Sequence, residues 1–317
     1  MFLRTFAVLA ASPLWLSMRA ETPVSLEIRA HPISAAPPPV RIDSNLVLVP
    51  VIVSDSKNRP VAGLEKESFR IFDDKVEQQV TQFAMDDEPL AIGLVFDASG
   101  SMGKKLQRSR AAAAAFFKTA NPDDEFFLVT FSDRPKLDVR LTSDPEQIQN
   151  RLAFTASKGN TAMLDAIYLA LAEIKRSNKP RKALLVISDG GDNDSRYTEA
   201  ELKSLARESD VLIYGIGIFE PYGSHGRTLE EMAGPDLLSE IAELTGGREF
   251  PVDNPKDLPD VAAKIGTELR SRYLLGFSPT DTQRDGRYHH LQVKMVQARG
   301  MPKVEAHWRS GYYAPGE

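Results

Sequence analysis

A chain of 317 residues, 42% hydrophobic and 26% charged, has the composition of a folded protein, which excludes a disordered chain. Its formal net charge of −5 argues against a nucleic-acid partner. The sequence holds no cysteine, which excludes disulfides, thiolate zinc sites, cysteine nucleophiles and a lipid-bearing cysteine. No metal-ligand spacing such as HExxH occurs among the five histidines, which we expect on surfaces or strands: His31, His225, His289, His290 and His307.

Residues 1–20 have the layout of a secretory signal peptide. Arg4 precedes a mostly apolar run from Phe6 to Met18, and Glu21 is the first acidic residue. This run is short for a membrane span, so we expect export to the periplasm or the cell exterior, with no membrane span in the mature chain. An uncleaved anchor is the alternative, because Met18 is larger than a cleavage site prefers. Residues 21–43, with HPISAAPPPV, are expected to form a proline-rich linker.

Residues 44–89 and 273–317 both have strand character. The first segment predicts short strands at 46–53, 69–72 and 79–83, separated by turns. The second predicts three strands, in YLLGFSPTD, RDGRYHHLQVKMV and KVEAHWRSGYY. Each segment is too small to bury a core alone. We therefore predict that the two segments pair into one small antiparallel β-sandwich, with the remaining domain inserted between them.

Residues 90–272 alternate strands with helices, which predicts an α/β fold with a mostly parallel sheet covered on both faces. Buried strands are expected where apolar runs are continuous, and helices where apolar residues recur every three or four positions. The strands are predicted at 91–97, 126–132, 182–188 and 211–218, with a shorter one in KLDVRLT; the helices are predicted at 104–118, 145–153, 162–176, 198–209, 229–245 and 255–272. The alanine run 111–115 predicts a closely packed helix face.

The stretch VFDASGSMGKK, residues 95–105, places Asp97, Ser99 and Ser101 at the end of a predicted strand. A phosphate-binding P-loop would require glycine in place of Ala98 and serine or threonine in place of Lys105. A phosphoaspartate phosphatase would require a second aspartate in place of Ser99. The sequence therefore gives phosphoryl chemistry poor support.

A divalent cation fits this stretch better, because hard ions prefer oxygen ligands. Asp97, Ser99 and Ser101 supply one carboxylate and two hydroxyls from a tight turn that the glycines permit. Thr161, in the helix-opening loop of KGNTAMLDAI, and Asp189, at the end of the strand in LLVISDGGDN, supply further oxygens. Together they predict a site for Mg²⁺, with Mn²⁺ or Ca²⁺ as alternatives.

On DASGS, on Thr161 within GNTA and on Asp189 within SDGGDN, residues 90–272 resemble a von Willebrand factor type A domain with a metal-ion-dependent adhesion site. The resemblance implies a Rossmann-like, doubly wound, mostly parallel sheet with the metal at its upper edge. It also implies that the serines bind the ion directly, that the aspartates and the threonine bind directly or through water, and that one position stays open for a partner's acidic residue. The element order, ending in RSGYYAP, resembles exported bacterial proteins that carry this domain between β segments.

We therefore expect an exported, non-enzymatic adhesion or scaffold module whose metal bridges to an acidic residue of a protein partner. One alternative is a metal-assisted hydrolase that uses His225, in the loop FEPYGSHGRTLEE, and loses activity in His225→Ala. The other is a domain whose metal is purely structural. Lys104 and Lys105 are expected to solvate the start of their helix, with attraction of an acidic partner as the alternative. Residues 192–194 are expected to form a polar loop, with tuning of the metal site as the alternative.

Overall fold

This computed structural model describes residues 46–189, 191–218, 229–280, 286–296 and 303–315, with only the backbone for 229–235. The predicted signal peptide, the linker and His225 lie outside these ranges. The described residues from 46 onward form one compact unit. Within that part of the chain, no helix combines the length and apolarity needed to cross a membrane.

The central domain is built on a six-stranded sheet with the strand order β10-β9-β8-β5-β6-β7. All neighbouring pairs are parallel except β6 with β7, which are antiparallel, so the predicted α/β class with a mostly parallel sheet is confirmed. The short strand β10 was not predicted, because EFPV has no continuous apolar run. The bounds are β5 (Leu90–Asp97), β6 (Glu125–Phe131), β7 (Pro135–Thr142), β8 (Arg181–Ser188), β9 (Val211–Ile218) and β10 (Glu249–Val252).

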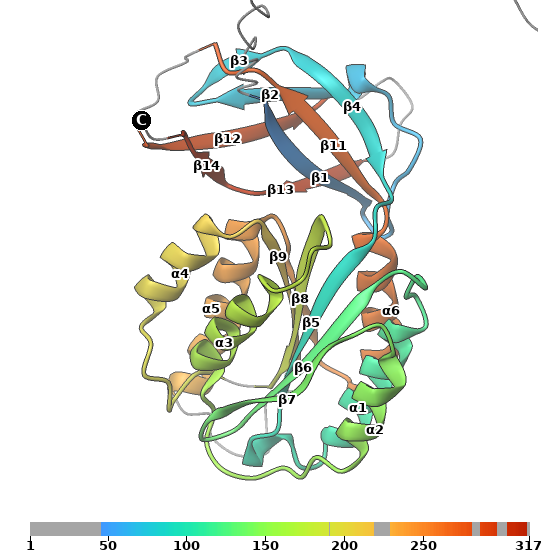
Figure 1. Cartoon of the computed structure of the whole chain (residues 1–317), viewed down its shortest axis with the longest axis vertical. Helices are drawn as coiled ribbons and strands as arrows, with labels where there is room; N and C mark the ends of the chain where they lie inside the picture. Colours follow the sequence, from blue (N-terminus) through green and yellow to red (C-terminus); the bar gives the residue numbers. More distant parts are fainter. Residues whose placement is uncertain (1–45, 190, 219–228, 281–285, 297–302, 316–317) are drawn as a thin grey trace, which may run out of the picture. The chain divides into compact units, whose positions relative to one another are not determined.

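Helices cover both faces of this sheet, α1, α2 and α6 on one face and α3, α4 and α5 on the other (Figure 1). Side chains alternate along each strand, so Leu94 of β5 belongs to the first core and Val95 to the second. In the alanine run, Ala112 and Ala113 are fully buried. The helices are α1 (Leu106–Phe117), α2 (Pro145–Ala153), α3 (Met163–Ile174), α4 (Glu199–Glu208), α5 (Leu229–Thr245) and α6 (Leu258–Leu269), with 3₁₀ turns at Lys66–Ser68, Gly100–Met102 and Pro255–Asp257.

Strands from the two chain ends pair in two four-stranded antiparallel sheets, ordered β13-β1-β11-β4 and β14-β12-β2-β3. The last predicted strand is two strands, because the chain passes from one sheet to the other at Arg309 and Ser310. The strands are β1 (Val47–Asp55), β2 (Phe69–Asp73), β3 (Val76–Gln78), β4 (Val80–Asp86), β11 (Arg272–Phe277), β12 (Tyr288–Met295), β13 (Val304–Trp308) and β14 (Gly311–Tyr313).

The last helix of the central domain ends earlier than predicted. α6 stops at Leu269, and Arg272 already begins β11, where its guanidinium binds the carboxylate of Asp86. The chain crosses between the antiparallel sheets and the central domain twice, at 86–90 and at 269–272. Arg181, which is 1% exposed, binds both of these chain crossings. Its guanidinium donates to the carbonyl oxygens of Asp86, Glu88 and Leu269. Arg181 of β8 thereby connects the first and the last residues of the central domain.

Candidate metal centre

Two of the predicted metal ligands lie at the ends of neighbouring strands. β5 and β8 are parallel and adjacent, with Phe96 opposite Ile187. Asp97, the last residue of β5, is fully buried, and Asp189 directly follows β8. Because parallel strands end at the same edge of a sheet, both carboxylates lie at the carboxyl edge, where α/β sheets bind their ligands.

Hydrogen bonds join four of the predicted ligands into one connected set. The Ser101 hydroxyl donates to Oδ1 of Asp189 at 2.8 Å. The hydroxyl oxygens of Ser99 and Ser101 are 3.0 Å apart, and the amide of Ser99 donates to Oδ1 of Asp97 at 2.7 Å. One carboxylate from each strand end and two hydroxyls from the turn thus face the same small volume.

Thr161, the fifth predicted ligand, is held beside this set through its backbone. Its amide donates to Oδ1 of Asn193 at 2.8 Å, and its carbonyl oxygen accepts from the amides of Asn193 and Asp194. Among the described residues, its hydroxyl makes no hydrogen bond to the other four predicted ligands. Residues 192–194 are polar, as expected, and Asn193 also ties the Asp189 loop to the Thr161 loop, a contact that short-range patterns do not predict.

The Thr161 loop also packs directly against the serine turn. The amide of Gly100 donates to the carbonyl oxygen of Gly159 at 2.9 Å, and the amide of Lys158 donates to that of Ala98 at 2.9 Å. Gly159 has φ of +79°, and a Cβ there would lie 2.5 Å from Oδ1 of Asp133. Only glycine fits this approach without displacing a neighbour.

Burial and a neighbouring charge set the electrostatics of Asp97. Burial, and then the charge of Asp189, raise the pKa of Asp97 from 3.8 to about 6. Hydrogen bonds oppose this shift; the Ser188 hydroxyl donates to Oδ2 of Asp97 at 2.6 Å. Sequence reasoning missed Ser188. The available signal was a hydroxyl residue at the strand end, one position before Asp189.

Lys105 differs from its prediction. Lys104 is exposed, as expected, but Lys105 is only 8% exposed, and its ammonium lies 2.6 Å from Oδ2 of Asp189. The prediction that Lys105 solvates the helix start is therefore wrong. The side chain of Lys105 turns inward because the carboxylate of Asp189 offers a buried counter-charge there. The two residues are 84 positions apart in the sequence, so no local pattern indicates this pair.

The donor set fits a hard divalent ion. It offers two carboxylates and neutral hydroxyls, the ligand types that Mg²⁺, Mn²⁺ and Ca²⁺ prefer. A fully buried carboxylate such as Asp97 is costly to ionise unless a cation lies near it, and a bound ion would remove that cost. Metal binding by these residues stays a prediction.

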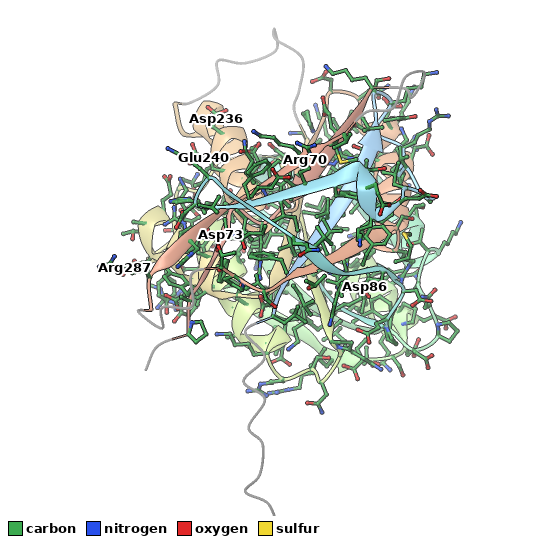
Figure 2. The ribbon with its side chains drawn as sticks, turned by 90° about the horizontal axis from the view of Figure 1, so that it is seen from above. Arg70, Asp73, Asp86, Asp236, Glu240 and Arg287 are labelled. Carbon is green, nitrogen blue, oxygen red and sulfur yellow. The ribbon has the colours of Figure 1, made fainter. Side chains whose placement is uncertain are left out.

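A second group of acidic residues and histidine lies in the antiparallel sheets. The ligand atoms of Asp73, Asp74 and His289 lie within 4.8 Å of one another, close enough to hold one metal ion. Both oxygens of Asp73, labelled in Figure 2, already have protein partners, Nδ1 of His289 at 3.1 Å and the hydroxyl of Tyr312 at 2.9 Å. These contacts fasten β12 and β14 to β2. His289 is a strand residue, as predicted, but its acidic partners were missed.

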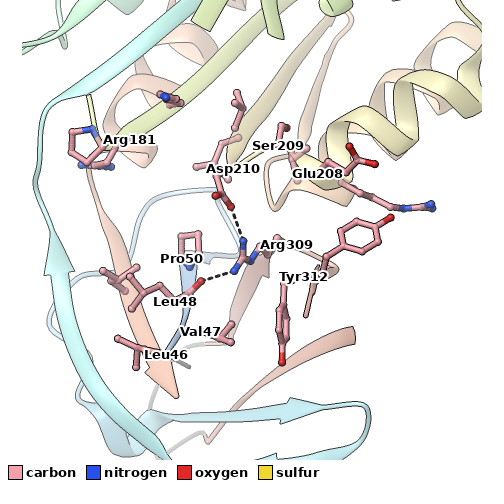
Figure 3. Close-up of a pocket in the computed structure, with 18 of the residues that line it drawn as sticks. Leu46, Val47, Leu48, Pro50, Arg181, Glu208, Ser209, Asp210, Arg309 and Tyr312 are labelled. Carbon is pink, nitrogen blue, oxygen red and sulfur yellow. Dashed lines mark hydrogen bonds and ion pairs between the residues drawn. The ribbon is translucent and has the colours of Figure 1, made fainter. Parts of the chain in front are cut away.

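A pocket of about 640 Å³ lies at the opposite edge of the parallel sheet. Arg181 and Val211, which begin β8 and β9, line it together with Leu48 of β1. Within it, Arg309 donates to the Asp210 carboxylate and to the carbonyl oxygen of Leu48, both at 2.8 Å (Figure 3). The pocket lies at the amino ends of the strands, so it is separate from the metal-ligand candidates.

Residues 92–191 match the family model described as von Willebrand factor type A domain. The chain is 27% identical over 184 residues to an uncharacterized protein of Borreliella burgdorferi, which covers 51% of this chain and 54% of that protein. It is 30% identical over 128 residues to inter alpha-trypsin inhibitor, heavy chain 4, of Mus musculus, which covers 36% of this chain and 14% of that one. The chain thus spans about half of the first relative and a small part of the second.

Among solved structures, von Willebrand factor type A from Catenulispora acidiphila matches with a TM-score of 0.50 and 13% identity, covering 86% of this chain and 73% of that one. At that identity the likeness concerns the fold alone. The match to residues 92–191 covers the serine turn, Thr161 and Asp189. The matched residues and the fold together identify the chain as a protein with a von Willebrand factor type A domain.

Proposed function

We propose that this protein is a metal-dependent protein-binding module of the adhesion or scaffold type, in which a divalent ion bridges to an acidic residue of a protein partner. The type A domain supports a protein-interaction role. The observation that carries the metal-dependent part is the hydrogen bond between Ser101 and Asp189, because it brings the serine turn of β5 to the carboxylate that follows β8. Asp97, Ser99, Ser101, Thr161 and Asp189 would hold the ion.

Charge and ligand type support an acidic residue as the bridging group. The two carboxylates neutralise a divalent ion, and the hydroxyls add no further negative charge. An ion bound in this way stays electrophilic and has a preference for another oxygen anion. A side-chain carboxylate on a protein partner supplies such an anion.

We propose binding rather than catalysis. Among the described residues, no histidine forms a hydrogen bond with any of the five candidate ligands, and a hydrolase would need a base within reach of the reacting water. The hydrolase alternative depends on His225, which lies outside the described residues. A purely structural metal would raise the melting temperature without changing the affinity for a carboxylate.

We also propose that the protein is exported, on the layout of residues 1–20. The two antiparallel sheets are further proposed to form a β-sandwich, because one hydrophobic cluster contains Val51 of β1 together with Ile71 of β2 and Val293 of β12. Packing between inward-facing side chains of two sheets is the arrangement that stabilises a sandwich.

Calorimetry with Mg²⁺ and Mn²⁺ tests the metal centre. Wild type is expected to bind one ion per chain, and Asp97→Asn to bind at least about tenfold more weakly, because it loses a charged ligand. Asp138→Asn is the matched control, since Asp138 lies in β7 and pairs with Arg151. Its affinity for the ion should equal that of wild type. No binding by wild type would sink the proposal.

Adding acetate to the Mn²⁺-loaded protein tests the open position. Acetate should displace a water ligand from the ion and lower the relaxation rate of solvent protons in wild type. If the relaxation rate of solvent protons does not change when acetate is added to the Mn²⁺-loaded protein, the metal is structural instead.

A further inference from the structure

Lys105 places a buried positive charge on one of the candidate metal ligands. Its ammonium is 2.6 Å from Oδ2 of Asp189, and the two side chains are 10% and 1% exposed. The other oxygen of this carboxylate accepts the hydroxyl of Ser101. Both oxygens of Asp189 therefore have partners, one neutral and one cationic.

Hydrogen bonds at the start of α1 hold the backbone of Lys105 in place. The amide of Lys105 donates to the carbonyl oxygen of Met102 at 2.8 Å. Its own carbonyl oxygen accepts the amide of Ser109 at 3.0 Å and the hydroxyl of Ser109 at 3.2 Å, and Ser109 is fully buried. These bonds anchor the backbone of Lys105, and burial of its side chain, which is 10% exposed, limits the positions that the ammonium can take.

The Lys105 ammonium has two opposite effects on the candidate metal centre. The ammonium compensates one of two neighbouring buried carboxylates, Asp97 and Asp189, which would otherwise repel each other with little solvent screening. A divalent ion at the same carboxylates would be repelled by the ammonium and would have to share Asp189 with it or displace it. Lys105 therefore stabilises the ligand arrangement and opposes the ion.

We propose that Lys105 is the internal counter-ion of the metal centre, which holds Asp189 in position and lowers the affinity of the centre for divalent cations. This inference rests on the proposed function of the same residues. With an ion bound and the ammonium still nearby, the ion, Lys105, Asp97 and Asp189 together carry one net positive charge, and one carboxylate from a partner neutralises it. Lys105 thus makes an acidic partner strengthen the binding of the ion.

The test compares Lys105→Met with Lys104→Met, which removes the same charge from the exposed neighbour. Calorimetry with Mg²⁺ is expected to give a dissociation constant about tenfold lower for Lys105→Met than for wild type, because a repelling charge is lost. In EDTA the melting temperature of Lys105→Met should fall by roughly 5 °C or more, because Asp189 loses its counter-charge. Lys104→Met should match wild type in both measurements, and Lys105→Arg should keep the weak ion binding. Lys105→Gln replaces Lys105→Met if that variant does not fold.

The outcomes separate this inference from the proposed function. If wild type binds Mg²⁺ and Lys105→Met binds it equally well or more weakly, Lys105 is no opposing counter-ion, although the metal centre stands. If only Lys105→Met binds Mg²⁺, the lysine excludes the ion from wild type, so Lys105 does oppose the ion but the proposed metal-dependent function of wild type is overturned. If neither protein binds the ion, both the centre and the role of Lys105 are overturned.

Discussion

The hydroxyl of Ser101 donates a 2.8 Å hydrogen bond to Oδ1 of Asp189, joining two loops that lie 88 residues apart in sequence. The contact forms because β5 and β8 are parallel neighbours whose ends lie at one edge of the sheet. The loop that holds Thr161 is tied to both of these loops by backbone hydrogen bonds and by the side chain of Asn193. A substitution in any one of the three loops should therefore shift the residues of the other two.

Ser188→Ala tests whether a residue that is not a candidate ligand positions Asp97. The substitution removes the 2.6 Å hydrogen bond to Oδ2 of Asp97. Metal affinity, measured by calorimetry, should fall by on the order of tenfold, as expected when the partner that orients a ligand is lost. Ser177→Ala is the matched control, because Ser177 is also buried and donates at 2.6 Å to Glu125, at the start of β6. Equal dissociation constants for both variants and wild type would exclude this role of Ser188.

Gly159→Ala tests the approach between the Thr161 loop and its neighbours. Gly159 and Gly63 both have φ of +79°, but a Cβ meets Asp133 at 2.5 Å in the first and nothing within 4 Å in the second. Gly63→Ala should lower the free energy of unfolding by about 1 kcal/mol, the cost of the left-handed backbone. Gly159→Ala should lower it by about 1 kcal/mol more, because moving the Asp133 carboxylate breaks its hydrogen bond with the amide of Asn160. Urea denaturation in EDTA measures both, and equal losses would contradict the prediction.

Arg181→Met tests the clamp on the two chain crossings. Burial, with the nearby charge of Arg272, lowers the pKa of Arg181 to about 10, so the side chain is charged at pH 7. Its loss leaves the carbonyl oxygens that it binds without a donor, and the free energy of unfolding should fall by about 3 kcal/mol. Arg176→Met, on a side chain that is 64% exposed, should cost less than about 0.5 kcal/mol. Denaturant unfolding of the two variants makes the comparison, and a similar small loss in both would rule out the clamp.

Glu249→Gln tests a half-buried carboxyl in β10. Burial, and then the charge of Asp236, raise the pKa of Glu249 from 4.5 to about 7. Its Oε1 atom has no hydrogen-bond partner in the part of the chain that the structure describes. The folded protein therefore binds an extra proton between pH 4.5 and 7, and its stability falls as pH rises through that window.

Glutamine has no proton to lose, so Glu249→Gln should match wild type near pH 5. At pH 8 it should be more stable by on the order of 1 kcal/mol, a value reduced for the partial exposure of the side chain. Thermal melts from pH 5 to 8 measure the difference. Glu208→Gln, which removes an exposed charge from α4, is the control, and its curve should run parallel to that of wild type. A Glu249→Gln curve that also runs parallel would contradict the assignment.

Local patterns were sufficient for most of the fold. The helices at 145–153 and 229–245 have the predicted bounds. Asp144 caps the start of α2, and Gly246, with φ of +86°, follows the end of α5. The four buried strands were predicted within one or two residues at either end, because doubly covered strands are continuous apolar runs. β3, β10 and the division between β13 and β14 were missed, because each depends on which neighbouring strand the chain meets.

The sequence by itself determined which residues are candidates for the metal centre, because Asp97, Ser99, Ser101, Thr161 and Asp189 all lie at strand ends or helix starts that short-range patterns mark. Only the tertiary structure decided what surrounds them. Lys105 turns toward Asp189 while Lys104 stays in solvent, and Ser188 turns toward Asp97. The physical reason is that burial and charge pairing depend on which strands lie side by side, and that information is distributed over the whole chain.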